Sequence, residues 1–161
     1  MTHFHATPYG TFKLVASDTG LREVKLDNDL SPHLEAPTHP ILLKTTRQLD
    51  AYFSGTLREF NLPFDWSGAT DFHRAVWRQL LEIKYGRTVS YQFIADRLGD
   101  PKACQAVGQA NRRNPIAIIV PCHRVIAKTG DLHGYFYGLD FKRSLLGLEN
   151  PKSFGVQGSL F

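Results

Sequence analysis

Residues 115–125, PIAIIVPCHRV, join an apolar run to a short polar segment. Residues 116–120 are all apolar, which is typical of a buried β-strand. A cysteine, a histidine and an arginine follow directly, at Cys122, His123 and Arg124. A thiol next to a base is an arrangement suited to nucleophilic catalysis. The pattern therefore predicts a core strand that delivers a reactive cysteine at its end.

The chain has 161 residues, of which 42% are hydrophobic and 21% charged. This composition is globular and fits one domain or two small ones. No apolar run approaches the roughly 20 residues of a membrane span, and residues 1–5 lack the features of a signal peptide. We therefore expect a cytoplasmic protein. Cys104 and Cys122 are too few for a disulfide framework, and Cys122 with His123 alone cannot build a closed zinc site.

Positive charge is concentrated in the second half of the chain. The net charge is +4, and nine Lys or Arg against three acidic residues lie between Arg74 and Arg124. Such an excess is compatible with nucleic acid binding without requiring it. The asymmetry predicts that the second half carries the binding surface.

The first half predicts a small α/β domain with antiparallel strands, residues 1–66. Residues 9–27 predict two short strands around the turn at residues 18–20: Phe12, Leu14 and Ala16 alternate with polar positions before the turn, and apolar residues follow it at 21, 24 and 26. Residues 28–40 are polar with three prolines and predict a loop. Apolar residues recur at helical spacing over 41–53, and Gly55 follows the predicted helix.

The second half predicts a mostly helical domain, residues 67–150, followed by a flexible tail, residues 151–161. Helices are expected from Thr70 or Asp71 to Gly86, over 91–98 behind a Ser90 cap, over 102–113 and over 139–150. The two middle helices flank Gly99-Asp100-Pro101 and form a helix-turn-helix. This motif binds DNA in many proteins, but it also occurs as plain helix packing. The fold class is therefore α+β.

The second helix of this motif is rich in small residues. Ala103, Ala106, Gly108 and Ala110 lie on it, whereas a helix that reads the major groove normally carries long polar side chains. A surface of small residues allows a close approach to the narrow minor groove. The alternative is that these residues pack against the core, and their spacing does not decide between the two.

The segment NPIAIIVPCHRVI, residues 114–126, resembles the active-site motif of the O6-alkylguanine-DNA alkyltransferases. The resemblance runs from Val89 to Glu149 and includes GDPKACQAVGQANRRNP, residues 99–115. The first half is similar to the amino-terminal domain of the family only in general pattern. The resemblance implies direct repair of DNA, in which a methyl or other alkyl group moves irreversibly from O6-alkylguanine to Cys122 in one turnover. O4-alkylthymine is a second candidate substrate, and no cofactor or metal is implied.

The resemblance also assigns catalytic roles. Cys122 is the nucleophile, and His123 removes its proton through a water molecule. Glu149 orients His123, and Asn114 holds the turn that presents the cysteine. Tyr91 donates a hydrogen bond that helps to neutralise the departing guanine. A free thiol with a pKa near 8.5 needs such an adjacent base, because the thiolate is the reactive species.

The substrate base lies inside a duplex and must be flipped out to react. By the same resemblance, the base pocket uses the backbones of Cys122 and Val125, the Tyr135 ring and the Phe136 amide, with Tyr91, Tyr137 and Asn111 beside them. Contacts to the minor groove of double-stranded DNA are expected from the helix-turn-helix and its surroundings, at Gln92, Lys102, Ala103, Gln105, Ala106, Gly108, Arg112 and Lys128.

Three features depart from the family pattern. Gln105 stands where an arginine usually fills the gap left by the flipped base. Tyr137 replaces a glycine in the loop of residues 135–138, and this bulk is expected to disfavour large groups such as benzyl. The zinc ligands of some members are not evident in the first half. His3, His5, His33 and His39 are expected to be exposed to solvent, and a zinc ion held by some of them is the alternative.

Other functions remain open at this point. A non-catalytic alkyltransferase-like protein would bind the lesion but lacks the cysteine. A helix-turn-helix regulator with a redox thiol would not need Tyr91, Asn114 and Glu149 together, and a cysteine hydrolase would turn over. We expect a monomer associated with the nucleoid.

The chain ends in QGSLF, residues 157–161, which resembles the short peptides by which bacterial repair proteins bind the sliding clamp. This motif predicts a clamp contact through Gln157, Leu160 and Phe161. The alternative is that Leu160 and Phe161 fold back on the core.

Overall fold

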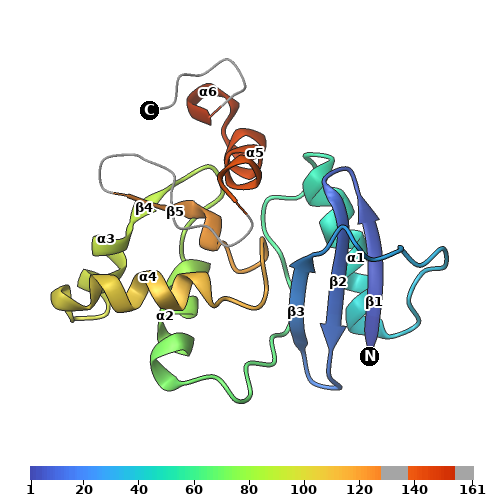
Figure 1. Cartoon of the computed structure of the whole chain (residues 1–161), viewed down its shortest axis with the longest axis horizontal. Helices are drawn as coiled ribbons and strands as arrows, with labels where there is room; N and C mark the ends of the chain where they lie inside the picture. The colour runs from blue at the N-terminus through green and yellow to red at the C-terminus, as the bar shows by residue number, and fades with distance from the viewer. Residues whose placement is uncertain (128–137, 155–161) are drawn as a thin grey trace. The chain divides into compact units, whose positions relative to one another are not determined.

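The computed structural model describes residues 1–127 and 138–154 and divides the chain into two compact units (Figure 1). The first unit contains residues 1–67 together with residues 115–119, and the second contains residues 68–114 and the chain from residue 120 onward. The first is an antiparallel sheet with a helix and the second is mostly helical, which confirms the expected fold class. The five residues 115–119 lie within the first unit although they come from the second half of the sequence.

The first unit is built on three antiparallel strands in the order β1-β2-β3, β1 (Thr2–Thr7), β2 (Gly10–Ala16) and β3 (Leu21–Leu26). Phe12, Leu14 and Ala16 of β2 are buried in alternation, because successive strand residues face opposite sides of the sheet. Helix α1 (Pro40–Phe53) packs against β1 and β2. Strand β1 was not expected from the sequence, because it shows no clean alternation and is defined by its pairing with β2.

One histidine of the first unit is buried, although the sequence predicted that all four are exposed. His3 was expected to be exposed, but only 5% of it is accessible. It lies on β1, where its Nδ1 is 3.3 Å from Nδ1 of His33, and His5 Nε2 is 2.7 Å from Asp50. Burial and the neighbouring charges of His33 and His5 lower the pKa of His3. Within the described ranges, no three His, Cys, Asp or Glu side chains form a group that could hold a metal ion.

Residues 116–120 do not form the predicted strand. Only Ile116 makes a β-bridge, to Val24: the Val24 N–H donates to the Pro115 carbonyl at 3.0 Å, and the Ala117 N–H donates to the Val24 carbonyl at 3.0 Å. The chain then turns tightly, and Ile118 takes a positive φ of 71°. This conformation is strained for a β-branched residue. The apolar run therefore indicated correctly that residues 116–120 are buried, but it did not indicate their backbone conformation.

The second unit follows the expected helical pattern with one shorter helix. Thr70 accepts a hydrogen bond from the His73 N–H, and Ser90 accepts one from the Phe93 N–H, so both predicted caps are confirmed. The first helix ends at Leu81 and not at Gly86, which lies in the following turn. The elements are α2 (Asp71–Leu81), β4 (Val89–Ser90), α3 (Tyr91–Arg97), η1 (Pro101–Ala103), α4 (Cys104–Arg112), η2 (Cys122–Arg124), β5 (Val125–Ile126), α5 (Leu139–Glu149) and α6 (Pro151–Phe154).

Helices α3 and α4 pack together around η1 and form the predicted helix-turn-helix. The expected tail begins at Pro151, but Pro151–Phe154 form α6. In the described part of the chain, no helix is long and apolar enough to cross a membrane. Several predicted functional residues lie outside the described residues, namely Lys128, Tyr135, Phe136, Tyr137, Gln157, Leu160 and Phe161.

Gly20 permits a close approach between β3 and residues 63–65. Leu21 N–H donates to the Pro63 carbonyl at 2.8 Å, and Asp65 N–H donates to the Leu21 carbonyl at 2.9 Å. A Cβ at Gly20 would lie 2.5 Å from the backbone carbon of Phe64, closer than real Cβ contacts. A side chain here would therefore push two backbone segments apart.

We predict that Gly20→Ala lowers the free energy of unfolding by about 2 kcal/mol, the usual scale of overpacking. Urea unfolding followed by tryptophan fluorescence measures the change. Asp18→Ala is the matched control, because Asp18 is exposed in the same turn. An unchanged midpoint for Gly20→Ala would contradict the close approach.

Candidate active site

A short parallel pairing brings the candidate residues together in the second unit. Val89 pairs with Val125 and Ser90 with Ile126, which joins β4 to β5. Tyr91 follows β4 directly, and the segment Cys122–Arg124 (η2) precedes β5. The ladder thereby joins two segments about 30 positions apart in the sequence, with Tyr91 directly after β4 and residues 122–124 directly before β5.

Cys122 is held in a tight backbone arrangement and is 5% exposed. Its N–H donates to the Val120 carbonyl at 2.8 Å, which closes a γ-turn. The same carbonyl accepts a hydrogen bond of 2.8 Å from Nδ2 of Asn114. The Asn114 side chain therefore joins the two ends of the segment 115–119, which belongs to the first unit. Asn111 Nδ2 donates to the carbonyl of Cys122 itself at 3.2 Å.

His123 is completely buried, and its Nε2 lies 2.6 Å from Oε2 of Glu149. Burial raises the pKa of Glu149, but the charges and hydrogen bonds of His123 and Arg124 outweigh this effect and hold it below its ordinary value. An ionised carboxylate can only accept, so Nε2 of His123 carries the proton. Nδ1 is then the free acceptor of the neutral ring, and it has no hydrogen-bond partner among residues 1–127 and 138–154.

Burial also lowers the pKa of His123, and Glu149 offsets only part of that effect. The ring is therefore neutral near neutral pH, with an unprotonated Nδ1. A neutral imidazole in this state is a base, and the carboxylate behind it stabilises the positive charge that forms when it takes a proton.

Arg124 completes the cluster around Glu149. Its Nε donates to Oε1 at 2.8 Å and its Nη2 to Oε2 at 3.1 Å, while Nη1 donates to the Ile83 carbonyl at 2.7 Å. The guanidinium also lies 5.7 Å from the centre of the Tyr85 ring. The sequence placed Arg124 beside the cysteine but gave it no role. Its bidentate geometry suits a carboxylate that must stay ionised while buried.

Lys142 was missed by sequence reasoning. It lies fully buried on α5, and its Nζ donates to the Val125 carbonyl at 2.7 Å. Burial lowers the pKa of Lys142 to about 8, and interaction with Cys122 offsets part of this shift. The available signal was helical spacing, because Lys142 precedes Glu149 by seven residues and so shares its face with the buried Leu145 and Leu146.

Tyr91 is partly buried at the start of α3. Burial raises the pKa of Tyr91, and the neighbouring Cys122 raises it further, so its hydroxyl keeps its proton. Gly108 of α4 lies next to the ring, since a Cβ there would be 3.8 Å from Cδ1 of Tyr91. The hydroxyl is therefore a donor near the cysteine.

The small residues of η1 and α4 divide between surface and core. Ala106 is exposed and Gly108 and Ala103 are partly exposed, whereas Ala110 is buried and its carbonyl accepts a 2.9 Å hydrogen bond from the Trp77 indole. Among the longer residues predicted to contact DNA, Lys102, Gln105 and Arg112 are exposed. Gln92 is partly exposed, and its Nε2 donates to Asp96 and to the Pro101 carbonyl, both at 2.9 Å.

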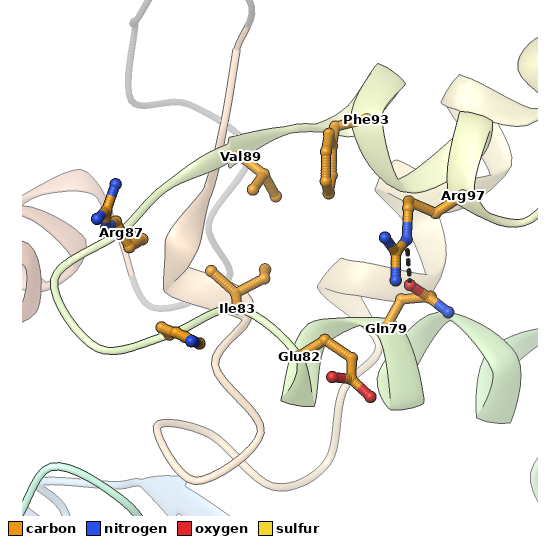
Figure 2. Close-up of a pocket in the computed structure, with 8 residues that line it drawn as sticks. Gln79, Glu82, Ile83, Arg87, Val89, Phe93 and Arg97 are labelled. Atoms are coloured by element: carbon orange, nitrogen blue, oxygen red, sulfur yellow. Dashed lines mark hydrogen bonds between the residues drawn. The ribbon is translucent and has the colours of Figure 1, made fainter.

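A cavity of about 350 Å³ lies elsewhere in the second unit, between the end of α2 and helix α3. Figure 2 shows Ile83, Val89 and Phe93 facing its interior, with Arg97 donating to Gln79 at its edge at 3.4 Å. None of the predicted site residues lines this cavity. The candidate site is therefore the cluster around Cys122.

Comparisons with known proteins agree with this geometry. Two family models match: 6-O-methylguanine DNA methyltransferase, ribonuclease-like domain, over residues 1–66, and the DNA binding domain of the same family over residues 71–151. A methylated-DNA–protein-cysteine methyltransferase of Methanosarcina barkeri is 46% identical over 89% of this chain and 92% of its own length. One from Mycolicibacterium paratuberculosis is 44% identical over 91% of this chain and 90% of its own length.

Solved structures give the same result. The crystal structure of Mycobacterium tuberculosis OGT in complex with DNA is 43% identical, with a TM-score of 0.83 over 93% of this chain and 92% of that one. Both halves of the sequence are matched by family models, and the relatives are covered almost completely. The chain belongs to the 6-O-methylguanine DNA methyltransferase family.

Proposed function

We propose that this protein repairs alkylated DNA directly, by moving the alkyl group of O6-alkylguanine onto Cys122 in a single irreversible turnover. The observation that carries the proposal is the His123–Glu149 pair beside a buried cysteine. With Nε2 of His123 bound to Glu149, the unprotonated Nδ1 is left to act as a base. Membership of the family supplies the substrate class.

The chemistry balances within the site. His123 takes the proton of the Cys122 thiol, directly or through a water molecule, and the thiolate attacks the alkyl carbon. The new S–C bond forms as the C–O6 bond breaks, and the electron pair of that bond stays on the guanine. Tyr91 donates a hydrogen bond toward the departing base, and the proton held by His123 neutralises the guanine. The products are guanine in DNA and S-alkylcysteine.

Recognition of DNA is assigned to α4 and the residues around it. We propose that the accessible face of this helix enters the minor groove, because the short side chains of Ala103, Ala106 and Gly108 allow a close approach. Lys102 and Arg112 supply charge for the phosphates. Gln105 can hydrogen-bond the cytosine left unpaired by the flipped guanine, but it brings no charge. We propose that the protein works as a monomer associated with the nucleoid.

The proposed transfer predicts a defined change in mass. Incubation with duplex DNA that contains O6-methylguanine should add one methyl group to Cys122 per protein, with no further turnover. Cys122→Ser should abolish the transfer and retain DNA binding, because a hydroxyl is a poor nucleophile of similar size. Intact-protein mass spectrometry and a gel-shift assay measure the two properties. Wild-type protein that binds the lesion but stays unmodified would support a lesion-binding protein, and product in excess of protein would support a hydrolase.

The state of His123 predicts the pH dependence of transfer. A base must be unprotonated, and the pKa of His123 is lowered from 6.5, chiefly by burial. The single-turnover rate at saturating DNA should therefore fall to half its plateau value only at a pH below 6.5. Rapid-quench assays between pH 5 and 8 measure this profile, with DNA binding measured at each pH as the control. A rate already halved at pH 7 would contradict a neutral, buried His123.

We further propose that residues 157–161 bind the sliding clamp. Gln157 would bond at one pocket while Leu160 and Phe161 fill an apolar one, which would raise the local concentration of the protein at copied DNA. A pull-down with purified clamp should retain the full chain and lose the double variant Leu160→Ala/Phe161→Ala. Methyl transfer to this variant from short oligonucleotides should be unchanged. Equal retention of both proteins would disprove this contact.

A further inference from the structure

Asn111 has an orientation that its surroundings fix. It lies near the end of α4 and is 2% exposed. Its Nδ2 is 3.2 Å from the carbonyl oxygen of Cys122. A carbonyl oxygen can only accept a hydrogen bond, so the amide nitrogen and not the amide oxygen must face it. The oxygen Oδ1 therefore points away from the Cys122 carbonyl.

This oxygen is a buried acceptor that lacks a donor within residues 1–127 and 138–154. Leaving a buried polar atom without a partner costs about 1–3 kcal/mol, and native proteins hold few such atoms. Among the described residues of this unit, the other buried acceptor without a partner is Nδ1 of His123, the proposed base. Both atoms belong to residues bonded to, or adjacent to, the nucleophile. An acceptor in this position is suited to a donor that arrives with the substrate.

The chemistry of the substrate identifies that donor. Alkylation at O6 removes the proton from N1 of guanine, so the exocyclic amine on C2 is the remaining N–H donor of the base. O4-alkylthymine has lost its N3 proton in the same way and has no exocyclic amine. A buried acceptor in the base pocket therefore favours alkylguanine, because only that base can satisfy it.

We propose that Asn111 is a specificity-determining residue, whose Oδ1 accepts a hydrogen bond from the C2 amine of the flipped O6-alkylguanine. This inference rests on the proposed function. Nδ2 performs a second task in the same residue, since it fixes the carbonyl of Cys122 beside the base. A planar amide held at one end and buried on a helix is rigid, so its oxygen is positioned before the base arrives.

The test removes the amine from the substrate and the acceptor from the protein. O6-methylhypoxanthine is O6-methylguanine without the C2 amine, and both are placed at the same position in one duplex. The wild-type protein should transfer the methyl group from methylguanine roughly tenfold faster, the scale of one neutral hydrogen bond in a site built to receive it. The ratio of the two single-turnover rates is the quantity to compare.

Asn111→Leu, of similar size, should bring this ratio close to one, mainly by slowing transfer from methylguanine. Loss of the bond to the Cys122 carbonyl would slow both substrates together and leave the ratio unchanged, so the ratio separates recognition from positioning. Gln109→Leu is the matched control on the exposed side of α4 and should keep the wild-type ratio. Asn111→Met replaces the leucine variant if that variant does not fold.

Two outcomes overturn the proposal. A wild-type ratio near one would show that the amine is not read, whatever the variants do. A wild-type ratio that persists in Asn111→Leu would assign the reading to other groups, such as the backbone carbonyls. Failure of the wild-type protein to methylate Cys122 from methylguanine would instead reject the proposed function, so the two failures are distinguishable.

Discussion

The ionised carboxylate of Glu149 is the interaction on which the candidate site depends. Burying a charge costs several kcal/mol unless partners compensate for it. Here two N–H groups of Arg124 and one of His123 bind the two carboxylate oxygens. Because Arg124 also donates to the Ile83 carbonyl, one buried charge joins the end of α5, the segment Cys122–Arg124 and the residues after α2. The direction of the His123 ring follows from this charge, and with it the free Nδ1.

A second constraint fixes the cysteine itself. The chain leaves the second unit after Asn114, contributes residues 115–119 to the first unit, and returns at Val120. The Asn114 side chain donates a hydrogen bond to the Val120 carbonyl, directly after this segment. The backbone of Val24 is hydrogen-bonded to the start of the segment, at Pro115 and Ala117. The strained backbone of Ile118 persists because the segment is held at both ends. Cys122 follows Val120 by two residues, so the hydrogen bonds that the Val120 carbonyl accepts from Asn114 and from the Cys122 N–H fix the chain directly before the cysteine.

Local signals predicted most of the fold, and long-range contacts account for what they missed. The caps at Thr70 and Ser90 and the two helices around η1 depend on neighbouring residues, so the sequence was sufficient for them. The apolar run 116–120 predicted burial correctly and conformation wrongly, because burial alone does not distinguish a strand from a turn. Arg124 and Lys142 carry no local sign of their buried partners, which lie at least 17 residues away. The proximity of Cys122, His123 and Glu149 followed from resemblance and could not be derived from spacing. The roles assigned to them stay predictions, as do those of Tyr135 to Tyr137, which lie outside the described residues.

The charged groups around Cys122 also explain how a buried site could hold a thiolate. In the resting state His123 is neutral, Glu149 is paired with Arg124, and the charge of Lys142 interacts with Cys122. In the proposed reaction, transfer of a proton from the thiol to His123 creates two opposite charges within the site and leaves its net charge unchanged, so no ion has to be brought in from water. Glu149 would then stabilise the protonated ring, and Lys142 would stabilise the thiolate. When the alkyl group moves, the negative charge leaves the sulfur for the guanine, and the proton on His123 can follow it. The sulfur is then a neutral thioether with no proton to recover and no leaving group to expel, which is why the geometry fits one turnover and not a cycle.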